Sequence, residues 1–185
     1  QYNLGYLYSK GRGVEQNMGE AVKWFLKAAI QGHTNAQFQL ALCYKSGNGI
    51  APNEEESIKW LTVAANEGHT NAQYSLGLLY KQQPSKKSLD YAMKWLSKAA
   101  SNEHISACFD LGLLYKSLHQ LETAFKWLKR AAVKGHKDAQ YELGCFYLDG
   151  EFVITNYVEA FKWFRVAASP NHTKAEFELG LLHEH

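Results

Sequence analysis

The chain has 185 residues, of which 46% are hydrophobic and 21% charged, with 20 Lys and Arg against 18 Asp and Glu. This balance is typical of a folded protein with an apolar core, and it excludes a disordered chain and a collagen-like fibre. The net charge of +2 comes from dispersed lysines, which neutralise few phosphates, so we expect no nucleic-acid partner. No segment approaches the roughly 20 apolar residues that cross a bilayer, and the first residues lack the features of a signal peptide, so we expect no membrane insertion.

Tryptophan marks an internal repeat. The five tryptophans recur every 32 to 36 residues, and a pair of alanines begins four residues after each: they are Trp24, Trp60, Trp95, Trp127 and Trp163. A leucine followed by a small residue recurs with the same period, in Leu4-Gly5, Leu40-Ala41, Leu76-Gly77, Leu111-Gly112, Leu143-Gly144 and Leu179-Gly180. Self-similarity at such a period indicates stacked repeats, each of which buries its apolar face against its neighbours.

Each repeat is predicted to be two helices, because apolar and small residues recur at helical spacing and no segment shows sustained alternation. A glycine in mid-helix is unfavourable, so the small residue after each leucine predicts close helix approach. In chain order the pattern places helices over residues 1–10, 17–31, 34–46, 53–67, 70–82, 87–101, 105–117, 119–134, 137–149, 156–169 and 173–184.

The ends of these helices carry their own signals. Three second helices open with Asn followed three residues later by Glu, at Asn17, Asn53 and Asn156, which predicts a capping box. Ser88 and Gln120 are the weaker predicted caps of the third and fourth repeats. Glycines near the helix ends predict left-handed terminating residues, and Glu103 and Asn171 stand at two of these positions instead.

The motifs of the repeat resemble those of a known family. They run Ala36-x-x-x-Leu40-Ala41-x-x-Tyr44-x-x-Gly47-x-Gly49, then Trp60-x-x-x-Ala64-Ala65-x-x-Gly68, and they recur across almost the whole chain. This pattern resembles the Sel-1-like repeat, a relative of the tetratricopeptide repeat. The resemblance implies an all-α fold: an α/α superhelix, a right-handed solenoid of five antiparallel helix pairs plus a terminal helix. We expect a single domain over 1–185, with repeats at 1–33, 34–69, 70–104, 105–136 and 137–172 and a partial one at 173–185. The third repeat departs from the pattern at 82–87, and the fourth shortens the same connection at 117–120.

Candidate chemical groups are sparse. One histidine per repeat, at His33, His69, His104, His136 and His172, lies in the turn between pairs; equivalent positions are about 10 Å apart, too far for one metal ion. The three cysteines, Cys43, Cys108 and Cys145, show no metal or disulfide spacing and favour a reducing compartment such as the cytoplasm. Asn171 begins a glycosylation triplet, which matters only in a secretory compartment. We find no nucleophile constellation and no phosphate loop, so we expect no enzyme activity, no cofactor and no metal.

The resemblance implies a partner-binding groove along the concave side, lined by the first helices. The residues implied are Asn35, Phe38, Leu42, Lys45, Asn71, Tyr74, Leu78, Lys81, Ser106, Phe109, Leu113, Lys116, Asp138 and Tyr141. The aromatic members form either an exposed stripe or contacts buried between repeats, and the sequence leaves both open. The lysines predict a mildly basic edge that suits an acidic or phosphorylated segment. A further lysine precedes each tryptophan, either on a solvated face with Glu–Lys pairs or as a series for an acidic partner.

The leading hypothesis is therefore a non-enzymatic scaffold or adaptor that binds a protein or peptide in its concave groove. The alternatives are a structural spacer segment of a longer solenoid and, more remotely, a hydrolase-type enzyme. Compartment, oligomeric state and partner identity are not encoded in the pattern.

Overall fold

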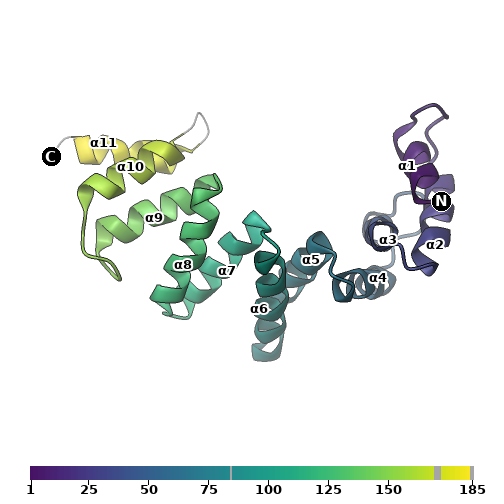
Figure 1. The fold of residues 1–185 in the computed structure, drawn as a ribbon, viewed down its shortest axis with the longest axis horizontal. Helices are drawn as coiled ribbons and strands as arrows, with labels where there is room; N and C mark the ends of the chain where they lie inside the picture. The colour runs from purple at the N-terminus through teal and green to yellow at the C-terminus, as the bar shows by residue number, and fades with distance from the viewer. Residues whose placement is uncertain (84, 169–171, 184–185) are drawn as a thin grey trace. The chain divides into compact units, whose positions relative to one another are not determined.

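The computed structural model describes residues 1–83, 85–168 and 172–183. In these ranges it contains helices and turns and no strand, which confirms the predicted all-α fold of five helix pairs followed by a last helix (Figure 1). The helices are α1 (Tyr2–Lys10), α2 (Met18–Ile30), α3 (Thr34–Ser46), α4 (Glu54–Asn66), α5 (Thr70–Lys81), α6 (Lys86–Ser101), α7 (Ile105–Ser117), α8 (Leu121–Val133), α9 (Lys137–Asp149), α10 (Tyr157–Ala167) and α11 (Thr173–His183).

Three of the predicted helix caps are confirmed. The Asn17, Asn53 and Asn156 side chains each accept a hydrogen bond from the backbone N–H three residues on, at 3.0 Å. The glutamates of the predicted capping boxes act differently, because their carboxylates accept from the lysine three residues further along the helix. These asparagines therefore satisfy the first free amides without a reciprocal bond.

Two predicted caps are wrong. Helix α6 begins at Lys86, so Ser88 lies inside its first turn, and the cap is Ser85, whose Oγ accepts from the N–H of Ser88 at 3.0 Å. Gln120 stands before α8 but makes no side-chain capping bond, as expected of a side chain one methylene longer than asparagine. At the other ends of the helices, Gly47 closes α3 with φ 75°, and Glu103 takes the left-handed conformation with φ 62°. Asn171, the equivalent predicted terminator and the start of the glycosylation triplet, lies outside the described residues.

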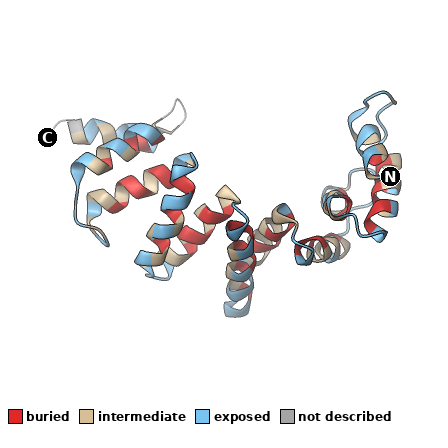
Figure 2. Cartoon of the chain, in the orientation of Figure 1, coloured by how far each residue is buried: buried red, intermediate tan, exposed pale blue. Residues whose placement is uncertain are grey.

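The contacts within the chain define two units, residues 1–98 and 99–185. We call them unit 1 and unit 2. The division falls between the two stretches, 82–87 and 117–120, where the repeat departs from its own pattern. In both units the buried residues follow the facing sides of the paired helices (Figure 2).

The small residues on the first helices allow these close contacts, as predicted. In unit 1, Gly5 lies against the ring of Phe25 and Gly77 against Leu96; a Cβ on either glycine would come within 2.8 Å of those side chains. In unit 2, Gly144 faces the ring of Phe164 in the same way. These contacts fix the packing of each pair and set which residues of the first helices stay accessible.

Candidate functional site

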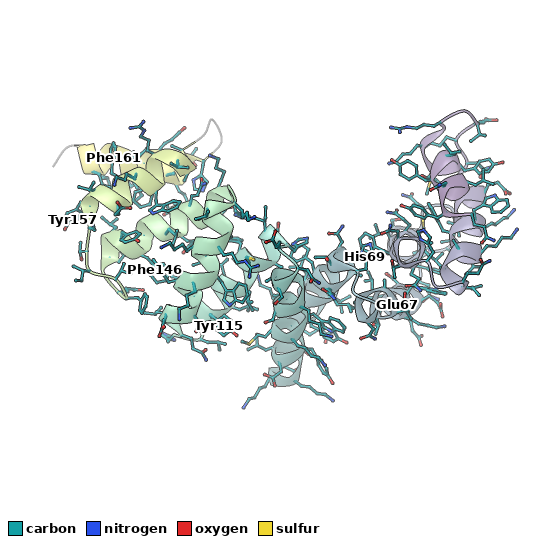
Figure 3. The ribbon with its side chains drawn as sticks, viewed as in Figure 1. Glu67, His69, Tyr115, Phe146, Tyr157 and Phe161 are labelled. Carbon is teal, nitrogen blue, oxygen red and sulfur yellow. The ribbon has the colours of Figure 1, made fainter. Side chains whose placement is uncertain are left out.

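The repeated histidines are helix caps. Each Nδ1 accepts a hydrogen bond from the N–H of an alanine three residues on, at 3.1 to 3.3 Å, in His33, His69, His104, His136 and His172. Figure 3 shows His69 in the turn between α4 and α5, close to Glu67. Since Nδ1 is the acceptor, the proton of the neutral ring is on Nε2. In the described part of the chain, no three His, Cys, Asp or Glu side chains are grouped as metal ligands.

Aromatic side chains of the first helices lie against these histidines. The ring of Phe38 stacks on His69 with centroids 4.5 Å apart, and the ring of Phe109 stacks on His136 at 4.3 Å. Tyr141 lies 5.2 Å from His172 in a tilted arrangement. These aromatic side chains and Tyr74 are half-buried, which matches the alternative of contacts between repeats rather than a freely exposed stripe.

Two of the predicted polar positions also contact the next repeat. Asn35 Oδ1 lies 3.1 Å from His69 Nε2 and accepts a hydrogen bond from its N–H, while Asp138 Oδ1 lies 3.5 Å from His172 Nε2. Asn71 is exposed and Ser106 is half-buried. Asn35 and Asp138, each three residues before an aromatic position, thus help to orient the histidine that the aromatic ring covers.

Other predicted residues line an open pocket in unit 1. A cavity of about 260 Å³ lies between α3, α4 and α5, and we call it the Leu42 pocket. Leu42 and Lys45, both predicted partner-binding residues, are on its wall. The full lining is Leu42, Tyr44, Lys45, Pro52, Asn53, Glu54, Ser57, Ile58, Leu61, Ser75 and Leu79. The lining combines five aliphatic residues and one tyrosine with five polar residues, among them one lysine and one carboxylate.

A second pocket in unit 1 occupies the same register one repeat earlier. It has a volume of about 520 Å³, and we call it the Tyr6 pocket. Its lining is Tyr6, Ser9, Lys10, Gln16, Met18, Phe25, Gln39, Cys43 and Asn48. Seven of these residues stand 36 positions before a lining residue of the Leu42 pocket: 6, 9, 16, 18, 25, 39 and 43 correspond to 42, 45, 52, 54, 61, 75 and 79. A pocket at this position is therefore a repeated feature of the fold and not an isolated irregularity.

In unit 2 an ion pair joins the equivalent positions. Lys116 stands where Lys45 stands in its repeat, and Glu142 stands where Ser75 does. Lys116 Nζ lies 2.7 Å from Glu142 Oε2 and 5.3 Å from the ring centroid of Phe146, which Figure 3 labels on α9. Burial would lower the pKa of Lys116, but the hydrogen bond and charge of Glu142 outweigh burial, so this pKa is raised. Lys116 is thus bound to its own chain.

The remaining predicted residues are accessible to different degrees. Lys45 and Lys81 are exposed, and the Leu42 residue is 37% exposed, whereas Leu78 and Leu113 are half-buried. Of the lysines in the predicted basic edge, Lys45 lines the Leu42 pocket, while Lys10, which is not among them, lines the Tyr6 pocket.

Buried glutamines are a feature that the sequence reasoning missed. Gln37, Gln73 and Gln140 are 2 to 4% exposed and donate through Nε2 to a backbone carbonyl eight residues earlier, at 3.0 to 3.4 Å. Cys108 occupies this position in its repeat, with Sγ 3.8 Å from the carbonyl of Ala100. The recurrence of glutamine beside a buried alanine in three repeats is the signal that could have identified these residues.

The cysteines are free thiols. Cys43 and Cys108 are buried, while Cys145 is half-buried. Burial is the largest influence on the pKa of Cys145 and raises it to about 11. A thiol with a raised pKa is a poor nucleophile near neutral pH.

Comparison with known proteins identifies the repeat. A family model described as the Sel1 repeat matches residues 1–33, 34–69, 70–104, 105–136 and 137–172. The chain belongs to the Sel1 repeat family. A crystal structure of a Sel1 repeat protein from Oxalobacter formigenes is similar at 33% identity and a TM-score of 0.81, over 96% of this chain and 73% of that one. A protective antigen of uropathogenic Escherichia coli with the same repeat fold shows 27% identity and a TM-score of 0.65, over 98% of this chain and 48% of that one.

A curated relative shares a shorter stretch. The rat protein named DAP3-binding cell death enhancer 1 is 48% identical over 40 residues, which span 22% of this chain and 8% of that protein. Sel1 repeats generally mediate protein–protein interaction and are generally non-enzymatic scaffolds. Among the described helices of this chain, none combines the length and the apolar character needed to span a bilayer.

Proposed function

We propose that this Sel1 repeat chain is a non-enzymatic interaction module that holds an acidic protein segment along α1, α3 and α5 of unit 1. The observation that carries the proposal is the pair of pockets in the same register, each open between a first helix, a second helix and the next first helix. Pockets repeated along a solenoid suit an extended chain, because an extended chain also presents its side chains at a regular interval.

Charge supports the acidic character of the partner. The sequences of α1, α3 and α5 contain Lys10, Lys45 and Lys81 but no Asp or Glu. The one carboxylate among the residues that line the two pockets is Glu54. An acidic segment would lie near Lys45, which lines the Leu42 pocket, and Lys10, which lines the Tyr6 pocket. Such complementarity favours both encounter and selectivity.

The rigid stacking of the repeats supplies the mechanism. The histidine caps and the aromatic rings that stack on them hold α3 and α5 at their N-termini. A partner that binds along α1, α3 and α5 would find its pockets already formed, which lowers the entropy lost on association.

Selection from a random peptide library displayed on phage tests the proposal. The bait is the purified chain, and the comparison bait is Leu42→Asp, which puts a charge at the mouth of the Leu42 pocket. Ile30→Asp is the matched control, because Ile30 is 70% exposed in the same unit and lines neither pocket. We expect peptides enriched in Asp and Glu that bind the chain and Ile30→Asp but not Leu42→Asp, with equal helicity by circular dichroism. Selection that yields no peptide sensitive to Leu42→Asp would overturn the proposal.

A further inference from the structure

We infer that the two pockets of unit 1 recognise two apolar side chains of one extended segment, an aromatic one in the Tyr6 pocket and an aliphatic one three residues away in the Leu42 pocket. This inference rests on the proposed function and specifies the partner that the groove would bind. It depends on three observations: the register of the pockets, the difference between their linings, and an ion pair at the equivalent position of unit 2.

The register sets the spacing of the two side chains. Seven lining residues of one pocket stand one repeat before seven of the other, so the pockets are separated by one step of the repeat. Helices α1 and α3 are direct neighbours, since Tyr2 stacks on the cap of α3, His33, at 4.5 Å. Equivalent positions of stacked repeats are about 10 Å apart. An extended segment in the polyproline II conformation has three residues per turn and advances about 3.1 Å per residue, so side chains three residues apart face the same side and lie about 9 Å apart, which joins the pockets.

The linings set the type of each side chain. The Tyr6 pocket is the larger, at about 520 Å³, and it combines the Phe25 ring and Met18 with the amides of Gln16, Gln39 and Asn48. A flat ring with a polar edge, that of Tyr or Trp, satisfies such a lining, because its face contacts the apolar groups and its edge meets the amides.

The Leu42 pocket is smaller, at about 260 Å³, and its apolar lining consists of Leu42, Ile58, Leu61, Leu79 and Pro52 together with the ring of Tyr44, beside five polar residues. An aliphatic side chain buries its whole surface there without leaving a polar group unpaired. The two pockets therefore differ in what they accept, and the difference gives the bound segment a direction as well as a spacing.

Unit 2 shows how the Leu42 pocket can be closed. The pair of positions held by Lys45 and Ser75 in unit 1 is held by Lys116 and Glu142 in unit 2, where the two side chains form an ion pair. The exchange of Ser75 for Glu would bring a carboxylate to Lys45 in the same geometry. Ser75→Glu is thus a variant for which the chain itself already contains a folded precedent.

Fluorescence anisotropy with labelled synthetic peptides tests the inference. The probe contains Tyr-Glu-Glu-Leu flanked by glutamates, and the comparison peptides place Tyr and Leu two or five residues apart or exchange either one for Ala. We expect each change to weaken binding about tenfold or more, because each removes one buried side chain from its pocket. The Tyr–Leu order is tested with the reversed peptide, which we expect to bind as weakly as the peptides with altered spacing.

Two protein variants complete the design. Ser75→Glu is expected to abolish binding of the probe, whereas Glu142→Ser, the matched change in unit 2, leaves it unchanged; circular dichroism and the unfolding midpoint confirm that both variants fold. Lys45→Met, which keeps an unbranched side chain one atom shorter and removes the ammonium group, reports the contribution of the charge. Peptides that bind in a Leu42-dependent manner but tolerate any spacing would overturn the inference and leave the proposed function standing. The absence of any Leu42-dependent peptide in the library selection would overturn both.

Discussion

The two units share one architecture but differ in the charge of their first helices. In unit 1, α1, α3 and α5 contain lysine as their only charged residue type. In unit 2, the described parts of α7, α9 and α11 contain six carboxylates: Asp110, Asp138, Glu142, Asp149, Glu176 and Glu178. The helix pairs, the glycine contacts and the histidine caps are the same in both. The repeat thus fixes the scaffold and leaves the accessible positions free to define different surfaces.

The difference is most specific at a single pair of positions. Ser75 leaves the Leu42 pocket open beside Lys45, whereas Glu142 binds Lys116. A neutral side chain at this position leaves the pocket open, whereas an acidic side chain forms an ion pair with the lysine of the same chain. Variants that affect one unit, both units or this pair alone can therefore distinguish residues that stabilise the shared fold from residues that define the surface of one unit.

The largest expected effect comes from a change that should break unit 2 and spare unit 1. A Cβ at Gly144 would lie 2.5 Å from Cδ1 of the Phe164 ring, which is fully buried and cannot move aside. We expect Gly144→Ala to lower the free energy of unfolding by about 1–3 kcal/mol, the usual effect of overpacking a core. Hydrogen exchange should show lost protection in α9 and α10 and little change in α1 to α4, since each repeat is coupled mainly to its neighbours.

Gly180 provides the matched control for Gly144→Ala. It occupies the equivalent position of α11, and a Cβ there meets nothing within 4 Å. We expect Gly180→Ala to be neutral or to stabilise α11 by up to about 1 kcal/mol through helix propensity. Equal destabilisation by both substitutions would show that the close contact with Phe164 is not the cause.

Much of this scaffold could be predicted from the sequence because each helix signal recurs in several repeats, and an uncertain assignment in one repeat is supported by the same signal in another. The leucine and small-residue series, the Asn17, Asn53 and Asn156 caps and the histidine turns recur with one period, and each has a single local physical reason. Ser88 and Gln120 show where that reasoning failed, because their repeats lack the asparagine that marks the helix start elsewhere.

The surface could be predicted only in part. Leu42 and Lys45, two of the predicted partner-binding residues, are exposed and line a pocket. The pairing of Lys116 with Glu142 and of Asn35 with His69 depends on contacts between residues more than 25 positions apart. No local pattern encodes such distances, so the sequence could not separate free positions from those used by the neighbouring repeat.

A second prediction concerns a property that both units share. Burial is the largest influence on the pKa of His69 in unit 1 and of His104 in unit 2, and it lowers both pKa values below 6.5. The unfolded chain therefore takes up protons first as the pH falls. The stability contributed by the neutral histidines is present above the unfolded pKa and is lost as the pH falls through the folded pKa. Protonation of Nδ1 also removes the acceptor of the capping bond.

We expect the free energy of unfolding to fall between about pH 7 and about pH 5, and we expect the double variant His69→Asn and His104→Asn to show a shallower slope. Asparagine keeps an acceptor for the cap but does not titrate in this range. Urea unfolding at several pH values measures the slope, which is compared within each protein, so a loss of ring stacking does not affect the result. An unchanged slope in the double variant would assign the pH dependence to other groups.

The smallest expected effect tests the ion pair that distinguishes the units. The Lys116 and Glu142 side chains are 34% and 21% exposed, whereas the Lys59 and Glu56 side chains on α4, paired at 3.0 Å, are 64% and 33% exposed. A double-mutant cycle with Lys116→Met and Glu142→Gln should give a coupling free energy of about 1 kcal/mol, because the pair is half-buried and screening is weaker. The same cycle at Lys59 and Glu56 should give a few tenths of a kcal/mol, as for other exposed pairs within one helix. High salt should reduce the second coupling more than the first. Couplings of equal size would mean that the Lys116–Glu142 pair is no stronger than an exposed ion pair. The contrast between the open position in unit 1 and the closed one in unit 2 would then depend on the size of the side chain alone.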